Sequence, residues 1–312
     1  MSLLTRKEVD GYISMVDRVP DAERKKIFAL LEMDRVERCR ESYLFFVQQM
    51  WPVFISGKHH QIMANAFERV VNGDLKRLII NMPPRHTKSE FASYLLPAWF
   101  LGKHPEKKII QTAHTAELAV GFGRKVRNLV QSEDYRKVFN TQLSSDSKAA
   151  GRWNTDKGGD YFAIGVGGAV TGKGADVLII DDPHSEQEAK QGNPAVFDNV
   201  YEWYTSGPRQ RLQPGGAIII VMTRWSKRDL TGQILKNSEK DGVNEWEVID
   251  FPAILPSGTP LWPAFWKKEE LEALKAELPV SKWEAQYQQN PTSEEGAIIK
   301  RDMWRLWEKE DP

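Results

Sequence analysis

The sequence is poor in the residues that mark a disulfide-bonded, zinc-binding or strongly basic protein. It has one cysteine, Cys39, which cannot form an internal disulfide and which favours a reducing compartment. Its six histidines show no spacing typical of a zinc site beside that cysteine. Basic and acidic residues number 43 each, so the formal net charge is zero. A protein that simply coats nucleic acid is therefore not expected, and any such contact should be confined to a loop or one face.

Long apolar runs are also missing, and a leader segment is not expected. The apolar run at 217–222 has the length of a strand, far short of a membrane span. Charged residues recur from Arg6 onward, which is not typical of a signal peptide. With 312 residues and 41% hydrophobic content, the chain can bury one large core, or one core and a small accessory lobe. We therefore expect a soluble, intracellular α/β protein.

Three segments differ in their sequence pattern. Residues 1–42 are charged with apolar residues at helical spacing, which predicts a helical arm that either contacts a neighbour or is simply solvated. Residues 43–251 alternate short apolar strands with helices, which predicts a mainly parallel sheet with helices on both faces. Residues 252–312 combine an aromatic elbow at 262–266 with a charged helix, which predicts a small lid or linker subdomain.

Apolar runs, periodicity and turn residues predict the individual elements. We expect strands at 78–80, 109–110, 161–166, 177–180 and 217–222, and helices at 60–71, 90–100, 115–130, 229–235 and 267–278. Pro97 is expected to kink or end its helix, because proline lacks the N–H that a helix interior needs. In a sheet of this type the ligand lies at the carboxyl ends of the strands, so the loops that follow the strands are the places to search.

The loop after the first of these strands has the makings of a phosphate-binding site. Residues 82–89 read Met-Pro-Pro-Arg-His-Thr-Lys-Ser and lead into a helix. A helix N-terminus offers free N–H groups and positive potential, Lys88 adds a charge for the β- and γ-phosphates, and Ser89 can ligate Mg²⁺. We expect a triphosphate to be held by the end of this loop, at the following positions: Pro84, Arg85, His86, Thr87, Lys88 and Ser89.

The loop departs from the usual G-x-x-x-x-G-K-[ST] pattern at both glycines. Met82 and Thr87 occupy those positions. A β-branched residue disfavours the positive φ that glycine adopts freely, so the loop alone is equally compatible with a basic helix start. Arg85 is either a surface charge or a group directed at the γ-phosphate.

A second half-motif lies at the end of the apolar run 177–180. It is followed by two acids, of which Asp181 suits Mg²⁺ binding and Asp182 can orient and activate a water molecule. Paired acids also form turns, especially before a proline such as Pro183. The two half-motifs occur in the order and setting of a P-loop ATPase, which favours the catalytic interpretation.

Two further polar positions complete the predicted site. Thr223 follows the strand at 217–222 and is our candidate for sensing the γ-phosphate and coupling its loss to motion, with Arg224 as its partner. The alternative is a strand that simply meets solvent. Gln61 opens the helix before the phosphate loop, where its amide can read the adenine edge while Trp51 or Phe54 stacks on the base. The alternative there is a surface glutamine.

Together these motifs resemble those of the large terminase subunit of tailed bacteriophages. The resemblance covers most of residues 43–291 and is specific in combination. The matching stretches are 60–61, 82–89, 171–176 running into 179–183, 223–225 and 286–291.

The resemblance implies a Mg²⁺-dependent ATPase of the additional-strand, RecA-like P-loop class that pumps double-stranded DNA into a procapsid. Its implied partners are the portal protein, the small terminase subunit and further copies of the chain in a ring, usually a pentamer. The implied location is the host-cell cytoplasm, with transient docking on the procapsid. Lys88, Ser89 and Asp181 inherit the phosphate and magnesium roles, Arg85 the γ-phosphate role and Thr223 the coupling role.

Two departures from the family pattern leave questions open. Thr87 stands where glycine is common, and Asp182 stands where many such motors have glutamate, so Glu186 is a second candidate for the catalytic base. The nuclease that normally follows the Gln-Gln-Asn-Pro region is not expected, because few residues remain after Pro291. We therefore expect an ATPase fragment or a split motor that cannot cut DNA.

Other functions remain possible from the sequence. A helicase or repair ATPase would need a second motor domain, and the missing glycines also suit a non-catalytic nucleotide-binding scaffold. The candidates for an arginine that completes a neighbouring subunit's site are Arg152, Arg209, Arg211 and Arg224. The loop cations that either meet DNA or are merely solvated are Lys148, Arg152, Lys157 and Lys173.

Overall fold

The computed structural model describes residues 3–146, 149–190, 193–241 and 245–292. Its helices are α1 (Arg6–Met15), α2 (Asp21–Glu41), α3 (Tyr43–Met50), α4 (Lys58–Asn72), the π-helix η2 (Glu90–Leu95), α5 (Leu96–Lys103), α6 (Ala116–Gln131), α7 (Glu133–Val138), α8 (Glu186–Lys190), α9 (Ala195–Ser206), α10 (Leu230–Asp241), α11 (Lys268–Glu277) and α12 (Val280–Gln286). Short 3-10 turns are η1 (Val16–Arg18) and η3 (Pro208–Arg211). The strands are β1 (Arg77–Asn81), β2 (Lys108–Ala113), β3 (Arg152–Asn154), β4 (Asp160–Gly165), β5 (Ala175–Asp181), β6 (Leu212–Met222) and β7 (Glu247–Asp250).

The strands form one seven-stranded sheet in the order β3-β4-β2-β5-β6-β1-β7. All neighbours pair in parallel except β3 with β4. The predicted mainly parallel sheet is therefore confirmed. Strand β6 lies between β1, which leads into the phosphate loop, and β5, which ends in the paired acids. This insertion is the additional strand that the resemblance implies.

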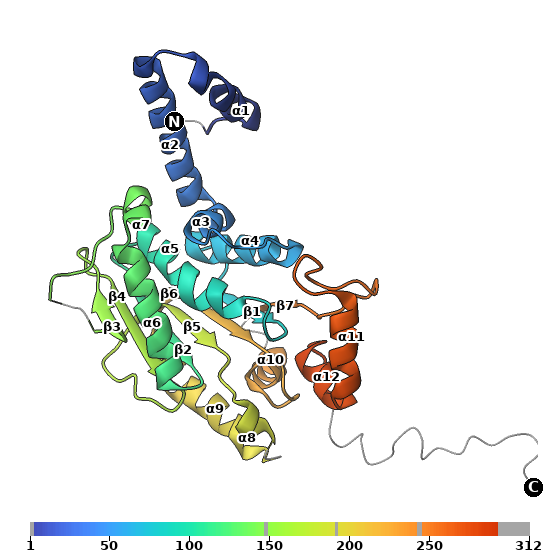
Figure 1. The fold of residues 1–312 in the computed structure, drawn as a ribbon. Helices are drawn as coiled ribbons and strands as arrows, with labels where there is room; N and C mark the ends of the chain where they lie inside the picture. The colour runs from blue at the N-terminus through green and yellow to red at the C-terminus, as the bar shows by residue number, and fades with distance from the viewer. Residues whose placement is uncertain (1–2, 147–148, 191–192, 242–244, 293–312) are drawn as a thin grey trace, which may run out of the picture.

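Both faces of the sheet are covered by helices. Successive strand residues point to opposite faces, so each strand contributes side chains to both cores. Leu78 and Ile80 of β1 face a core formed with α3 to α7, while Ile79 faces a second core formed with α9 and α10 (Figure 1). Every apolar residue of β1 is thus buried, which explains its continuous apolar run.

The helix that follows the phosphate loop does not end at Pro97. It begins with the π-turn η2, in which the Leu96 N–H bonds to the Phe91 carbonyl five residues back, and it continues as α5 to Lys103. Pro97 lies in the first turn of α5, where a missing N–H is tolerated. Of the two expectations for Pro97, a helix end is therefore wrong, whereas an irregularity is present as the π-turn directly before it.

The termini form separate features beside the sheet. Helices α1 and α2, in dark blue, extend away from the body, and α11 and α12 lie beyond the β7 edge (Figure 1). The C-terminal segment has its own small core of Ala253, Leu271 and Trp283. Strands β3 and β7 were not predicted, because both are short edge strands without a continuous apolar run. None of the helices in the described part of the chain is both long and apolar enough to cross a membrane.

Candidate functional site

The two half-motifs converge at the carboxyl edge of the sheet. Lys88 Nζ lies 2.8 Å from Asp182 Oδ2. The Ser89 hydroxyl donates a hydrogen bond of 3.0 Å to one oxygen of Asp181, and the Ser93 hydroxyl donates one of 2.7 Å to the other. The start of the helix after β1 and the end of β5 therefore face each other directly, with a cation on one side and two carboxylates on the other.

The electrostatics of this cluster favour a bound cation. Burial, and then the charge of Asp182, raise the pKa of Asp181 to about 7, although Lys88 and the two serine hydroxyls oppose the shift. Burial acts against the charge of Lys88, but Asp182 and Asp181 outweigh it and raise its pKa. A fully buried carboxyl with a raised pKa beside a charged lysine is typical of a functional site.

The phosphate loop adopts the backbone conformation that its sequence was expected to resist. Arg85 has φ 62° and Thr87 has φ 70°, both in the left-handed region. Thr87 thus takes the glycine-like conformation of the standard motif despite its branched side chain, at a typical cost of about 1–3 kcal/mol. Alternating left-handed residues turn successive N–H groups inward, which is the geometry of an anion-binding nest.

Thr223 joins the three strand ends. Its backbone N–H donates to Asp182 Oδ1 at 2.8 Å, and its hydroxyl donates to the Met82 carbonyl at 3.1 Å. It is almost fully buried. A movement of Asp182 or of the start of the phosphate loop would therefore displace Thr223 at the end of β6.

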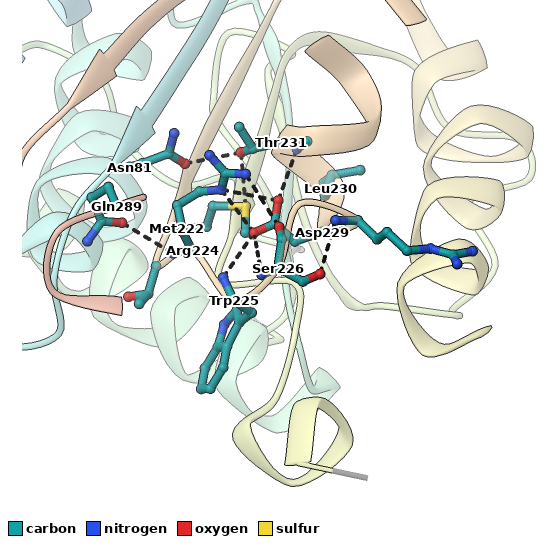
Figure 2. Close-up of polar contacts among 12 residues, drawn as sticks. Asn81, Met222, Arg224, Trp225, Ser226, Asp229, Leu230, Thr231 and Gln289 are labelled. Atoms are coloured by element: carbon teal, nitrogen blue, oxygen red, sulfur yellow. Dashed lines mark hydrogen bonds and ion pairs between the residues drawn. The ribbon is translucent and has the colours of Figure 1, made fainter. Parts of the chain in front are cut away.

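Arg224 lies in a buried network rather than at the surface. Its Nε bonds to the carboxylate of Asp229, which is fully buried and also accepts from the Trp225 and Gly232 N–H groups, both at 2.9 Å. The Arg224 N–H donates to Gln289 Oε1 at 3.2 Å. Figure 2 shows how these contacts connect the end of β6 with the start of α10 and the C-terminal segment. Asp229 therefore caps α10, because its carboxylate accepts the Gly232 N–H in the first turn.

We expect Asp229→Asn to lower the free energy of unfolding by about 2 kcal/mol, because hydrogen bonds to charged groups contribute that much when buried. The matched control is Asp198→Asn, which removes an exposed partner of Arg228 at 2.6 Å and should cost less than about 1 kcal/mol. Urea denaturation of both variants measures the difference. Equal losses would show that burial of the Arg224 pair contributes nothing.

A cavity of about 290 Å³ opens beside the loop. It is lined by Trp51, Val53, Phe54, Ile55, Arg85, Thr87, Glu90, Trp262 and Phe265. The two aromatic residues expected to stack on a base therefore line it, together with two from the C-terminal segment. Gln61 is exposed and is not among the lining residues.

The remaining predicted residues occupy different surroundings. Arg85 is exposed and reaches the cavity, whereas the His86 ring is buried, with Nδ1 2.8 Å from the Pro84 carbonyl and its face stacked on Trp266. Any role of His86 in phosphate binding therefore falls to its backbone. Glu186, at the start of α8, pairs with Lys282 at 2.9 Å. Of the two candidates for the catalytic base, Asp182 is therefore the one that lies next to Lys88.

The surface cations are less informative. Arg152 is exposed on β3, Arg209 and Arg211 are partly exposed in η3, and Lys148 lies outside the described residues. Lys173 pairs with Asp160 at 3.3 Å and Lys157 with Asp156 at 3.3 Å. Arg224, being buried, is the one arginine candidate whose present position does not suit contact with a neighbour.

Two residues of the site escaped sequence reasoning. Ser93 lies one helical turn after Ser89, and this i, i+4 spacing was a signal that both hydroxyls point the same way. His60 belongs to the matching stretch 60–61 but was not predicted to contact the loop, and its Nε2 lies 2.7 Å from Thr87 Oγ1. Nothing local in the sequence indicated that contact.

The donor set fits magnesium better than zinc. Mg²⁺ prefers oxygen ligands and is usually held by one or two protein groups together with substrate phosphates. The hydroxyl of Ser89 and the carboxylate of Asp181 supply such oxygens side by side. Within the described part of the chain, no group of three or more histidine, cysteine or acidic side chains is arranged to bind a metal by itself.

Comparison with known proteins gives a similarity in fold but none in sequence. No protein-family model matches the chain, and no curated protein matches it in sequence. The large terminase of bacteriophage HK97 superposes with a TM-score of 0.51 at 14% identity, over 82% of this chain and 55% of that protein. A mutant large terminase ATPase domain from Thermus phage P74-26 superposes with a TM-score of 0.49 at 14% identity, over 78% and 97%. The chain thus spans about half the length of the HK97 protein, and it has the RecA-like P-loop ATPase fold found in phage large terminases.

Proposed function

We propose that the chain is the ATP-hydrolysing motor domain of a viral terminase, which translocates double-stranded DNA into a procapsid. The observation that carries the proposal is the meeting of Lys88 and Ser89 with Asp181 and Asp182 across the end of β6. The fold shared with the HK97 large terminase supports the choice among P-loop ATPases.

The loop and helix would hold the triphosphate. The free N–H groups at the helix start and the inward-facing amides of the left-handed turn supply neutral donors, and Lys88 supplies charge. Arg85, which lines the cavity, would approach the γ-phosphate. When bound with ATP at Ser89 and Asp181, Mg²⁺ supplies neutralisation of the charge that develops on the phosphates.

Asp182 is our candidate for orienting the attacking water. It pairs with Lys88 and accepts a hydrogen bond from the Thr223 N–H. A triphosphate competes for Lys88, because its charge density exceeds that of one carboxylate. Asp182 then loses its cation while keeping the Thr223 contact, so the state of the phosphates is communicated to the end of β6. From there, Arg224 and Gln289 lead to the C-terminal segment.

The cavity beside the loop would hold the adenine base. Base stacking on aromatic rings contributes about 1–3 kcal/mol for each base in nucleic-acid complexes. Trp51 and Phe54 come from the segment before α4, and Trp262 and Phe265 from the C-terminal segment. A base held between them would tie that segment to the ATPase core. Gln61 would reach the base edge only from the rim.

Translocation would require further copies and partners. We propose a ring of identical chains, most simply a pentamer, on the portal protein, supplied with DNA by the small terminase subunit in the host cytoplasm. An arginine from one copy would complete the site of the next. Among the candidates, Arg152, Arg209 and Arg211 are at least partly exposed.

Steady-state phosphate release tests the enzymatic part of the proposal. The unaltered protein should hydrolyse ATP with Mg²⁺, and Lys88→Ala should lower the rate roughly 100-fold, because a charge that stabilises the transition state is removed. Equal, slow release by both proteins would instead indicate a non-catalytic scaffold. DNA translocation needs its own assay, in which the chain drives packaging into procapsids, and strand separation without packaging would favour a helicase.

A further inference from the structure

Thr87 is held in a conformation that its side chain disfavours. Its φ of 70° belongs to the left-handed region, in which β-branched residues are rare. The residue immediately precedes Lys88, so its φ and ψ decide where the lysine and the following N–H groups point. A branched residue at this position needs contacts from elsewhere in the fold to keep the turn in place.

A chain of hydrogen bonds supplies those contacts. The Gly57 N–H donates to His60 Nδ1 at 2.8 Å, so this nitrogen must carry the lone pair. The proton of the neutral ring is then on Nε2, which lies 2.7 Å from Thr87 Oγ1 and donates to it. The Thr87 hydroxyl in turn donates to the His86 carbonyl at 2.5 Å. Each donor meets an acceptor, and the direction of every bond is fixed by the backbone N–H at its start.

The His60 ring is itself immobilised. It is fully buried, stacks on Phe91 with ring centres 4.8 Å apart, and meets the edges of Phe54 and Trp262. Phe91 lies on the helix that begins at the phosphate loop, and Gly57 caps α4. The ring therefore forms a rigid connection between the start of α4 and the phosphate loop. Burial keeps it neutral, as the directed bonds require, by lowering its pKa to about 2.

We propose that His60 is a positioning residue, which holds the phosphate-binding loop in its left-handed turn through the hydroxyl of Thr87. The pair replaces the glycine of the standard motif: glycine adopts the turn without help, whereas here threonine adopts it because histidine holds its side chain. The role in ATP binding rests on the proposed function, but the effect on loop conformation does not.

A double-mutant cycle tests the proposal. His60→Phe keeps a ring against Phe91 but removes both hydrogen bonds, and it should raise the Kd for Mg-ATP about tenfold as the loop relaxes. In the Thr87→Gly background the same change should alter Kd by less than about twofold, because glycine needs no support. His60→Gln, which can return an N–H donor near the position of Nε2, should recover part of the affinity.

The control is His104→Phe. His104 directly follows α5, at the end of that helix remote from the phosphate loop. Its Nε2 lies 3.0 Å from the Val71 carbonyl of α4. Its replacement should lower the Tm without changing Kd, which separates positioning from general stability. Equal effects of His60→Phe in the threonine and glycine backgrounds would overturn the proposal, and so would a Kd that stays unchanged when threonine is present.

Amide hydrogen exchange separates this proposal from the proposed function. If the unaltered protein binds no ATP, the proposed function fails, but the exchange rates of the Lys88 and Ser89 amides still report on the loop. His60→Phe should speed their exchange when residue 87 is threonine and not when it is glycine. Exchange that is unchanged by His60→Phe, or changed equally in both backgrounds, would refute the positioning role whatever the protein binds.

Discussion

Asp182→Asn should lower the kcat of ATP hydrolysis about a thousandfold, within the range that general bases contribute. The affinity for Mg-ATP should stay the same or increase, because one negative charge beside the phosphates is removed. Single-turnover phosphate release gives the rate, and equilibrium titration with a fluorescent ATP analogue gives the affinity.

Asparagine is a suitable replacement because it leaves the local structure intact. Asp182 has φ 41°, and asparagine is among the few residues that tolerate this region. Its side-chain oxygen can still accept the hydrogen bond from Thr223, which is 2.8 Å long in the structure. The variant therefore removes the charge and the basicity but keeps the connection to β6. A large fall in rate could not be attributed to a collapsed turn.

Glu186→Gln is the matched comparison. Glu186 pairs with Lys282 of α12, and its side chain is about half exposed. We expect the rate to change less than about threefold, since an exposed ion pair contributes little. The assignment of the base would be reversed if Glu186→Gln caused the larger loss. If neither variant slowed hydrolysis, the water would have to be oriented by a group outside both positions.

The second large effect is expected on acidification. When the pH falls from about 7.5 to about 5.5, three buried histidines should together contribute a loss of about 4 kcal/mol in the free energy of unfolding, at about 1.4 kcal/mol each. The residues are His59, His60 and His86, which are almost completely buried. Burial is the main cause that lowers their pKa values, to about 3, about 2 and about 4 respectively.

The sign follows from proton binding in the two states. In the unfolded chain these histidines take up protons below a pKa of about 6.5, while in the folded protein they remain neutral. The unfolded state therefore binds more protons, and acid favours it. The stabilisation is complete above pH 6.5 and is lost progressively as the pH falls toward the lowered values. Asp181 acts in the opposite sense between its ordinary pKa and about 7, because its carboxyl binds a proton more readily when folded.

Asp181→Asn removes the opposing titration and isolates the histidines. Urea denaturation in this background at both pH values should show the full loss. Adding His59→Phe, which keeps a ring against Trp262, should reduce the loss by about a third, one histidine's share of the total. A loss that is unaffected by this substitution would mean that other groups cause the acid sensitivity.

The sequence determined the long buried strands and the chemistry of the site. Continuous apolar runs predicted β1, β2, β5 and β6, because strands covered on both faces need apolar residues at every position. The lysine and serine after β1 and the acids at the end of β5 were predicted as site residues because they follow these strands. Residues that follow parallel strands necessarily meet at one edge of the sheet, so their proximity could be expected before the structure was known.

Tertiary structure decided what local patterns do not encode. That β6 separates β1 from β5, that Glu186 is drawn to Lys282 and that Arg224 is buried against Asp229 all depend on which segments pack together. The conformation of Thr87 is the clearest case. Its own preference opposes the turn, and the preference is overruled by His60, a residue on another helix. A local sequence specifies intrinsic backbone preferences and periodicity, but the contacts that override them come from distant residues and exist only once the chain has folded.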